Sequence, residues 1–441
     1  MTNPLPDLHS HLSQLTKQIL NLLLKTPYTP HETSRISTKS TLESLLSTEL
    51  SLKDFALGCS LLSASRSSTH ELLTWIPDHL STVAETAFSD LSKAYNVPGG
   101  EKRNLAAELM LEIVPVLKDK IKESSIDESD EADEFSAASA RAPVDFAILA
   151  AYQFRWFVSK IEYLDLDKMV NLVIPCALTC LDHWSPEVKG QGMISFIHVA
   201  KNVKAGVLDW YGDVILDACC QNIASADEIW LYVVEMSVLL VTCIERDDPR
   251  SLWFEKILTE MLSHLERQPR NRERRIVWLK FIEPIFNSMG LLLLVHIGRI
   301  FLLLFQWLHV DDDETVLLVL KQIHTIVRLT WIRKSPYFER LVDELVVLYK
   351  EAALRKARED IRTGILNLLI MLQQCKSLQF ETAWNKHRND PNLTALDSNL
   401  LVSRDSIKPK ERSEQKVETE PTPEKIELMI NRAKVGDEAR A

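Results

Sequence analysis

A chain of 441 residues with only 11 glycines has few positions for tight turns or phosphate-binding loops, since average usage of about 7% would give about 31. The hydrophobic share of 46% is enough for a large core, and the formal net charge of -11 opposes the sign that nucleic-acid binding requires. These values predict an all-α fold and argue against nucleotide-binding loops, hairpin-rich folds and nucleic-acid partners.

The first 122 residues are predicted to form an N-terminal helical region that is less regular than the rest. They begin without the basic and continuously apolar segments of a secretory signal. The seven cysteines are odd in number and lie mostly within apolar helical runs, which indicates a reducing compartment. We therefore expect a cytoplasmic protein, with the nucleus as a second location.

Residues 123–143 (ESSIDESDEADEFSAASARAP) carry many acids and few apolar side chains, so they are predicted to form a disordered acidic linker. Ser124, Ser125 and Ser129 are followed by acids, which is the pattern preferred by acid-directed kinases of the casein kinase type. We treat them as candidate phosphorylation sites, because a phosphate there adds charge without a packed structure to disrupt. An unmodified spacer is the alternative.

Residues 144–385 are predicted to form a solenoid of HEAT/ARM-like helical repeats, because helix-sized apolar patterns follow one another with short connections. Such connections require successive helices to pack antiparallel. The expected helices cover residues 145–161, 166–183, 186–203, 206–223, 226–245, 249–267, 271–288, 290–309, 312–332, 336–356 and 359–376. Three helix starts carry capping signals: Ser185 before Pro186, Ser225 with Glu228, and Asp248 before Pro249.

The stretch LDHWSPEVKG, residues 181–190, has two interpretations. Its histidine, acids and lysine would suit an active-site loop, and the same residues would suit a turn between two packed helices. With its neighbours it resembles a HEAT repeat, whose pattern has Asp in the turn and Val-Lys or Val-Arg opening the second helix. We favour the turn, with Asp182 and Lys189 bonded to the backbone and to each other. The pattern is matched by Asp182, Val188 and Lys189 and, in a poorer second copy, by Asp311 and Val316. Pro186 is a further structural residue of the turn.

Residues 291–308 (LLLLVHIGRIFLLLFQWL) are almost wholly apolar and long enough for a membrane span. His296 and Arg299 lie at the centre, where an ionised side chain costs several kcal/mol in lipid. A buried helix of a large helical protein has the same composition. We therefore expect a buried helix without membrane contact, in which both side chains face acids or backbone carbonyls of a neighbouring helix.

No catalytic or cofactor-binding motif occurs in the sequence, so we expect no enzyme activity, no cofactor and no small-molecule substrate. Cys176, Cys180 and His183 share one helix face, but a structural zinc needs a fourth ligand that the adjacent sequence lacks. Five arginines within residues 267–275 form a basic cluster, which is interpreted first as a solvated turn between repeats and second as a partner-binding loop. The candidate partner-binding residues are Arg270, Arg272, Arg274 and Arg275.

Residues 386–441 include KPKERSEQKVETEPTPEK and lack a core-forming pattern. They are predicted to be a mostly disordered tail.

The segment CLDHWSPEVKGQGMISFIHVAKNVKAGVLDWYGDVILDACCQ joins a turn, a Lys-Gly pair and a helix to an aromatic-rich helix that leads into a third. With it, residues 145–375 resemble the Tti-two family, the smaller Tel-two-interacting subunit of the TTT complex. The resemblance implies a non-catalytic scaffold that binds the larger HEAT-repeat protein Tti-one and Tel-two.

Such a scaffold supports the maturation and stability of PI3-kinase-like kinases with the ninety-kilodalton heat-shock chaperone. ESDE at residues 128–131 is similar to the acidic phosphoserine motif that the PIH adaptor of the co-chaperone complex reads. The alternative function is another ARM/HEAT-repeat adaptor, in transport or trafficking.

Overall fold

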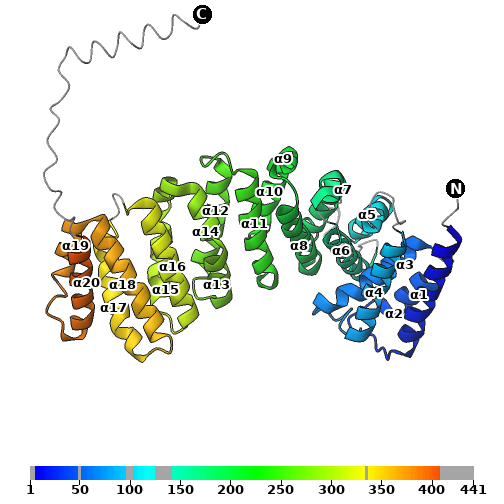
Figure 1. Cartoon of the computed structure of the whole chain (residues 1–441), viewed down its shortest axis with the longest axis horizontal. Coiled ribbons are helices and arrows are strands. Elements are labelled where there is room, and N and C mark those ends of the chain that lie inside the picture. The colour runs from blue at the N-terminus through cyan, green and yellow to red at the C-terminus, as the bar shows by residue number, and fades with distance from the viewer. Residues whose placement is uncertain are drawn as a thin grey trace, which may run out of the picture. The chain divides into compact units, whose positions relative to one another are not determined.

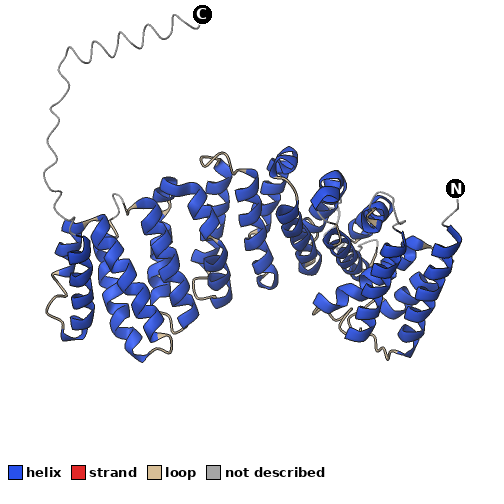
Figure 2. Ribbon diagram, viewed as in Figure 1, coloured by secondary structure: helices blue, strands red, loops and turns tan. Residues whose placement is uncertain are grey.

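The computed structural model describes residues 5–47, 51–95, 103–124, 142–161, 163–332 and 336–407. Within these ranges all regular secondary structure is helical (Figure 2), which confirms the predicted all-α class. The contacts divide the chain into a first unit, residues 1–385, and a second unit, residues 386–441. The division falls where the tail was predicted to begin.

The first unit contains the helices α1 to α19. The first ten are α1 Leu5–Lys25, α2 Thr38–Ser47, α3 Leu52–Ala64, α4 Asp78–Tyr95, α5 Leu105–Glu123, α6 Val144–Ser159, α7 Tyr163–Leu181, α8 Pro186–Asn202, α9 Ala205–Leu208 and α10 Gly212–Asn222. The others are α11 Trp230–Ile244, α12 Leu252–Arg267, α13 Arg272–Phe281, α14 Glu283–Met289, α15 Ile297–Leu308, α16 Asp313–Thr330, α17 Phe338–Glu351, α18 Arg358–Cys375 and α19 Ser377–Trp384. Short 3-10 segments relevant below are η3 Asp209–Tyr211, η4 Asp227–Ile229, η5 Gly290–Val295 and η6 Ala352–Leu354.

From α5 onward the helices alternate between two layers (Figure 1). Layer A consists of α5, α7, α10, α12, α15, α17 and α19, and each of these helices packs against the next one in the layer. Layer B consists of α6, α8, α11, α13 with α14, α16 and α18, which also pack in series. Each layer-A helix and the following layer-B helix form one repeat, so the array is a helical-repeat solenoid, as predicted.

The region before the array is continuous with it. Helix α3 packs against α4 and against the layer-B helix α6, while α1 packs against α2 and α4. Helix α5 belongs to layer A although it precedes the predicted linker, because its main neighbours are α6 and α7.

The two layers explain the composition of their helices. Helix α11 (WLYVVEMSVLLVTCI) packs against α10 of its own repeat and against α8 and α13 on either side, so most of its positions are apolar. Helix α12 buries one face, which includes Phe254, Ile257, Leu258 and Met261 at helical spacing, and its other face is polar. The core lies between the layers, where the rings of Trp278 and Trp307 meet edge-on with centroids 6.0 Å apart.

The predicted capping contacts are wrong at the level of single side chains. Helix α8 begins directly after Ser185, as expected, but the Ser185 side chain makes no capping hydrogen bond. Ser225 donates to Asn222 Oδ1 at 3.3 Å and does not cap α11, which begins beyond the intervening η4. Helix α12 is capped by Ser251, whose side chain accepts the N–H of Trp253, and not by Asp248.

The apolar segment 291–308 is broken in the structure. Gly290, with φ +52°, a sign of φ that glycine adopts most easily, begins the 3-10 helix η5, and His296 lies between η5 and α15. Arg299 of α15 makes two hydrogen bonds of 2.7 Å to Glu266 of α12, an acid on a neighbouring helix as expected, although the arginine is only half-buried. His296 is buried, and burial lowers the pKa of its imidazole.

No single helix in the described ranges is both long enough and apolar enough to cross a membrane. By length and composition alone, one pair bent by 47° meets that criterion, Arg272–Phe281 followed by Glu283–Val295.

The second unit is described as far as residue 407. Its described part contains η7 Pro391–Leu393 and the helix α20 Thr394–Ile407. The predicted tail therefore begins with helical structure, and its remaining residues lie outside the described ranges.

A test of the packing within one repeat uses Gly192 of α8. A Cβ atom there would lie 2.6 Å from Cys180 Cβ and 3.1 Å from the carbonyl oxygen of Ala177, both on α7. Because α7 would have to shift, we expect Gly192→Ala to lower the free energy of unfolding by about 1–3 kcal/mol. Gly206→Ala, which meets only Asp209 Oδ2 at 3.8 Å, is the control. Urea unfolding followed by circular dichroism gives both values, and equal midpoints for the two variants would refute the close approach.

Candidate functional site

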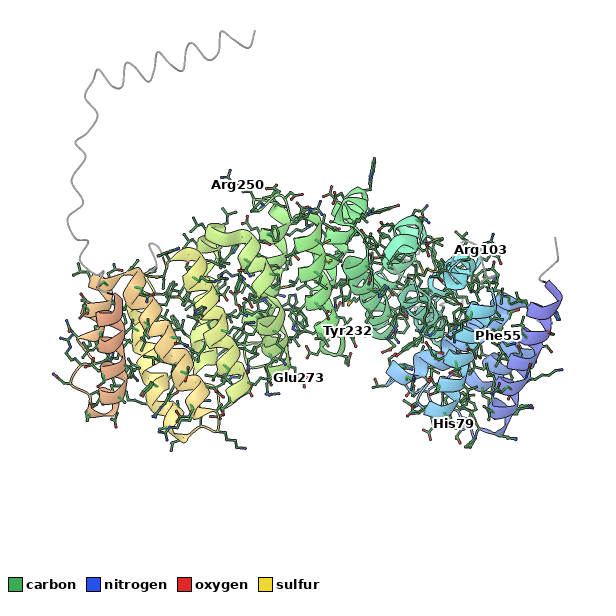
Figure 3. All side chains as sticks on the ribbon, viewed as in Figure 1. Phe55, His79, Arg103, Tyr232, Arg250 and Glu273 are labelled. Atoms are coloured by element: carbon green, nitrogen blue, oxygen red, sulfur yellow. The ribbon has the colours of Figure 1, made fainter. Side chains whose placement is uncertain are left out.

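The polar residues predicted from the sequence gather where the layer-B helices begin. Layer-A and layer-B helices run antiparallel, so their starts lie at opposite edges of the array. Arg250, before α12, and Glu273, in the first turn of α13, mark these two edges (Figure 3). We call the row of contacts at the layer-B starts the turn ladder; it consists of Lys189, Asn222, Asp227, Arg272, Arg274, Arg275, Asp312, Asp313, Thr315 and Arg355.

The HEAT-like turn at residues 181–190 joins α7 and α8, the two helices of one repeat. Val188 is fully buried, and Lys189 Nζ donates to Oδ1 of Asn222, the last residue of α10, at 2.9 Å. Burial lowers the pKa of Lys189, and the charge of Asp182 opposes this shift. At the end of α7, the backbone N–H of Asp182 donates to the carbonyl oxygen of Leu178 at 3.0 Å. Lys189 thus bonds Asn222 of the next repeat, a partner that differs from the expected Asp182 and backbone.

In the second turn the acid in the ladder is Asp312, one residue after the predicted Asp311. Asp311 is exposed, whereas Asp312 accepts the N–H of Thr315 at 3.3 Å and a hydrogen bond from Arg272 Nη2 at 3.0 Å. Burial raises the pKa of Asp312, but the hydrogen bonds from Arg272 and Thr315 outweigh it and lower the pKa overall. Val316 is fully buried, as its place in the repeat pattern predicts.

Three of the four candidate arginines contact neighbouring repeats. Arg272 reaches α16 through Asp312 and through Glu314 Oε2 at 3.2 Å. Arg275 is buried, and its Nε donates to Thr315 Oγ1 at 3.2 Å. Arg270 is exposed. The basic cluster is therefore mostly used inside the array, and a partner-binding role remains a prediction for the parts that stay accessible.

Arg274 is the most enclosed member of the cluster. Its Nε pairs with Asp227, its Nη2 donates to the carbonyl oxygen of Ser225 at 3.1 Å, and its guanidinium lies 4.7 Å from the ring centroid of Trp230. The Trp230 indole N–H donates back to the Arg274 carbonyl at 3.1 Å. One side chain thus joins the start of α13 to η4 and α11 through charge, hydrogen bonds and ring contact.

A cavity of about 470 Å³ opens beside these residues, and Asp227, Arg274 and Glu314 are among the side chains that line it. Three cations of its lining are paired within the array: Lys280 with Glu314 at 2.7 Å, Arg272 with Glu314 at 3.2 Å, and Arg274 with Asp227. Glu228 and Glu273 line the cavity as well.

The acidic segment begins at a buried polar cluster. Ser124, directly after α5, is buried, with its Oγ 3.0 Å from His183 Nε2 and its carbonyl oxygen 3.0 Å from the Trp184 indole nitrogen. The N–H of Ser185 donates to His183 Nδ1 at 3.0 Å, so Nε2 carries the imidazole proton and donates to Ser124. Phosphorylation of Ser124 would require this contact to open. Ser125 and Ser129 lie outside the described residues.

The candidate metal ligands have other roles. Cys176 and Cys180 are buried free thiols, and all seven cysteines, each within the described residues, are free. His183 is engaged with Ser124. Across the described part of the chain, no group of three or more histidine, cysteine or acidic side chains is placed to hold a metal ion.

Removal of Arg274 should weaken the junction between repeats. We expect Arg274→Ala to lower the free energy of unfolding by about 2–4 kcal/mol, because it leaves the Ser225 carbonyl and the Trp230 face without their partner. Arg270→Ala, in the same cluster but exposed, should change it by less than about 0.5 kcal/mol. Urea unfolding measures both, and hydrogen exchange should place the loss in α11 and α13. Equal effects of the two variants would contradict this role.

His183 should make stability depend on pH. Burial lowers its folded-state pKa from 6.5 to about 4, so between these values the unfolded chain binds more protons and stability falls as the pH falls. Between pH 7 and pH 5 this group should remove roughly 1–2 kcal/mol. Urea midpoints at both pH values should show a smaller drop for His183→Gln than for the wild type. His79→Gln, at an exposed position, should keep the full drop; an unchanged drop in His183→Gln would refute the assignment.

No family model matches the chain. The crystal structure of an engineered protein is similar over 90% of this chain and 93% of its own, with a TM-score of 0.42 and 12% identity. The uncharacterized protein At2g39910 of Arabidopsis thaliana is 55% identical over 418 residues, which cover 90% of this chain and 95% of that protein. At this identity and coverage, the chain belongs to the same family as the Arabidopsis protein At2g39910.

Proposed function

We propose that the chain is a non-catalytic scaffold of the kind found in the TTT complex. In this role it binds the larger HEAT-repeat protein Tti-one and Tel-two, and it supports the maturation and stability of PI3-kinase-like kinases with chaperone help. The partners and the pathway come from the resemblance of residues 145–375 to the Tti-two family.

The supporting observation is the kind of surface that the array leaves exposed. Arg272, Arg274 and Arg275 contact neighbouring repeats, whereas several large apolar side chains lie at the surface; they include Trp210, Leu252, Val295 and Leu378. Exposed aromatic and apolar groups are typical of protein-binding surfaces, where burial by a partner supplies most of the binding free energy. Repeat arrays present such groups over long surfaces because each repeat contacts only its neighbours. Protein binding is therefore the function that this geometry supports best.

Affinity purification tests the proposal. The full-length tagged chain is purified from its own cells at moderate salt, and the bound proteins are identified by mass spectrometry against a tag-only control. We expect a large HEAT-repeat protein, Tel-two and PI3-kinase-like kinases. Transport factors or membrane coat proteins in their place would overturn the TTT assignment and favour the other adaptor role.

Depletion of the chain supplies an independent readout. If the scaffold supports kinase maturation, the steady-state amounts of several PI3-kinase-like kinases should fall after depletion while their messenger RNAs stay constant. Re-expression of the wild-type chain should restore them. Unchanged kinase amounts would speak against the maturation role even if the complex were recovered.

A further inference from the structure

Four successive layer-A helices begin beside an exposed apolar side chain. Tyr163 at the start of α7 is 44% exposed, Trp210 just before α10 is 91% exposed, Leu252 at the start of α12 is 78% exposed, and Val295 just before α15 is 75% exposed. These helices lie side by side in layer A, and their starts form the edge that Arg250 marks in Figure 3. We call these four residues the apolar edge.

Trp210 lines a cavity of about 490 Å³. Val170 of α7 and Val207 of α9 supply apolar lining, Tyr211 stands next to Trp210, and Asp167 adds a carboxylate. The almost fully exposed indole and the apolar part of this cavity, Val170 and Val207, are both left to water. A partner side chain that enters the cavity would cover both at once, which is the arrangement of a binding hot spot.

The charges around Trp210 favour a cationic partner. Asp167 accepts the backbone N–H of Lys204 at 3.3 Å, and Asp213 accepts the indole N–H of Trp253 at 3.1 Å, so both carboxylates bond neutral donors. Asp209 is exposed beside Trp210. Within the described residues, none of these three carboxylates forms an ion pair with a lysine or arginine.

The positive groups nearby are partly committed elsewhere. Lys168 lines the same cavity and pairs with Asp165 at 3.5 Å, and Lys204 lies over the Tyr163 ring, 5.5 Å from its centroid. Arg246, whose charge acts on Asp209, pairs with Asp247 at 3.1 Å. The starts of α7 and α10 each add about half a positive charge from the helix dipole, which the carboxylates offset. A lysine or arginine of a partner could therefore meet the Trp210 ring face and at least one unpaired carboxylate.

The spacing of the apolar edge suits an α-helix. Neighbouring packed helices lie about 8–10 Å apart, so the apolar edge offers one apolar group in each such interval. An α-helix returns to the same face every seven residues, which is about 10.5 Å. An extended strand fits less well, because residues about 10 Å apart are three positions apart and point to opposite faces.

We propose that the apolar edge binds an amphipathic α-helix of a partner protein, with one apolar residue per heptad on the edge and a lysine or arginine beside Trp210. The inference rests on the proposed scaffold role and specifies the chemistry of a partner for it. A second copy of this chain and an acidic segment are the competing occupants.

Two synthetic peptides, each three heptads long with the same leucine heptad face, provide the test. One carries lysine and arginine at the flanking positions and the other carries glutamate. Fluorescence anisotropy with the purified full-length chain measures the Kd of each. We expect the basic peptide to bind at least about tenfold more tightly than the acidic one, and its affinity to fall when the salt rises from about 0.1 M to about 0.5 M.

Variants locate the binding to the apolar edge. Trp210→Ala should raise the Kd of the basic peptide by at least about tenfold. Leu354→Ala truncates a side chain that is 96% exposed at the opposite edge, and it should leave this Kd unchanged. A triple variant should abolish the preference for the basic peptide; it combines Asp167→Asn, Asp209→Asn and Asp213→Asn. Each asparagine keeps a hydrogen-bond acceptor and removes only the charge.

The proposal would be overturned if neither peptide bound, if both bound equally, or if Trp210→Ala and Leu354→Ala lost affinity equally. It would also be overturned if sedimentation showed that the chain forms a dimer and that dimer formation prevents peptide binding. Because the test uses purified components, its failure would leave recovery of the TTT partners from cells unaffected. Conversely, peptide binding at the apolar edge without those partners would remove the TTT assignment alone.

Discussion

Burial of the interior layer-B helices on three sides is the constraint on which the rest of the array depends. For α8, α11 and α16, the layer-A helix of the same repeat covers one side, and the layer-B helices before and after cover two others. Apolar burial is strong but not directional, so it does not by itself prevent one repeat from sliding along the next. The turn ladder supplies the directional contacts, with Lys189 on Asn222 and Arg272 on Asp312. Stability comes mainly from the first effect and register from the second.

Arg274 shows that a contact that fixes the alignment of neighbouring repeats also costs free energy. A buried guanidinium loses its hydration, and its partner Asp227 stays largely exposed, so the pair is not an efficient source of stability. The Trp230 ring and the Ser225 carbonyl compensate for part of the loss. Breaking the arrangement is nevertheless expensive, because it leaves buried groups without partners. The same logic holds for Ser124 and His183, where a small polar cluster fixes the end of α5 against the turn before α8.

The sequence was enough to predict the repeat helices, because their apolar period and short connections repeat along the whole array. It was not enough to place single polar contacts. Within the acidic run at residues 311–314, the capping acid depends on where α16 begins, and this differs by one residue from the prediction. The burial of Arg274 and Arg275 had a usable signal, since Trp278 and Leu279 follow each of them by one helical turn. The contact between Ser124 and His183 had no such signal in the sequence, because these residues are 59 positions apart.

The direct packing of α5 on α6 has a consequence for the chain between them. Both ends of that connection, after Ser124 and before Val144, are held by helices of the same repeat. The closure entropy of a connection grows only logarithmically with its length, so that doubling the length costs about 0.6 kcal/mol. Because these two ends are held in place, a connection of twice the length would lower the free energy of unfolding by only about 0.6 kcal/mol.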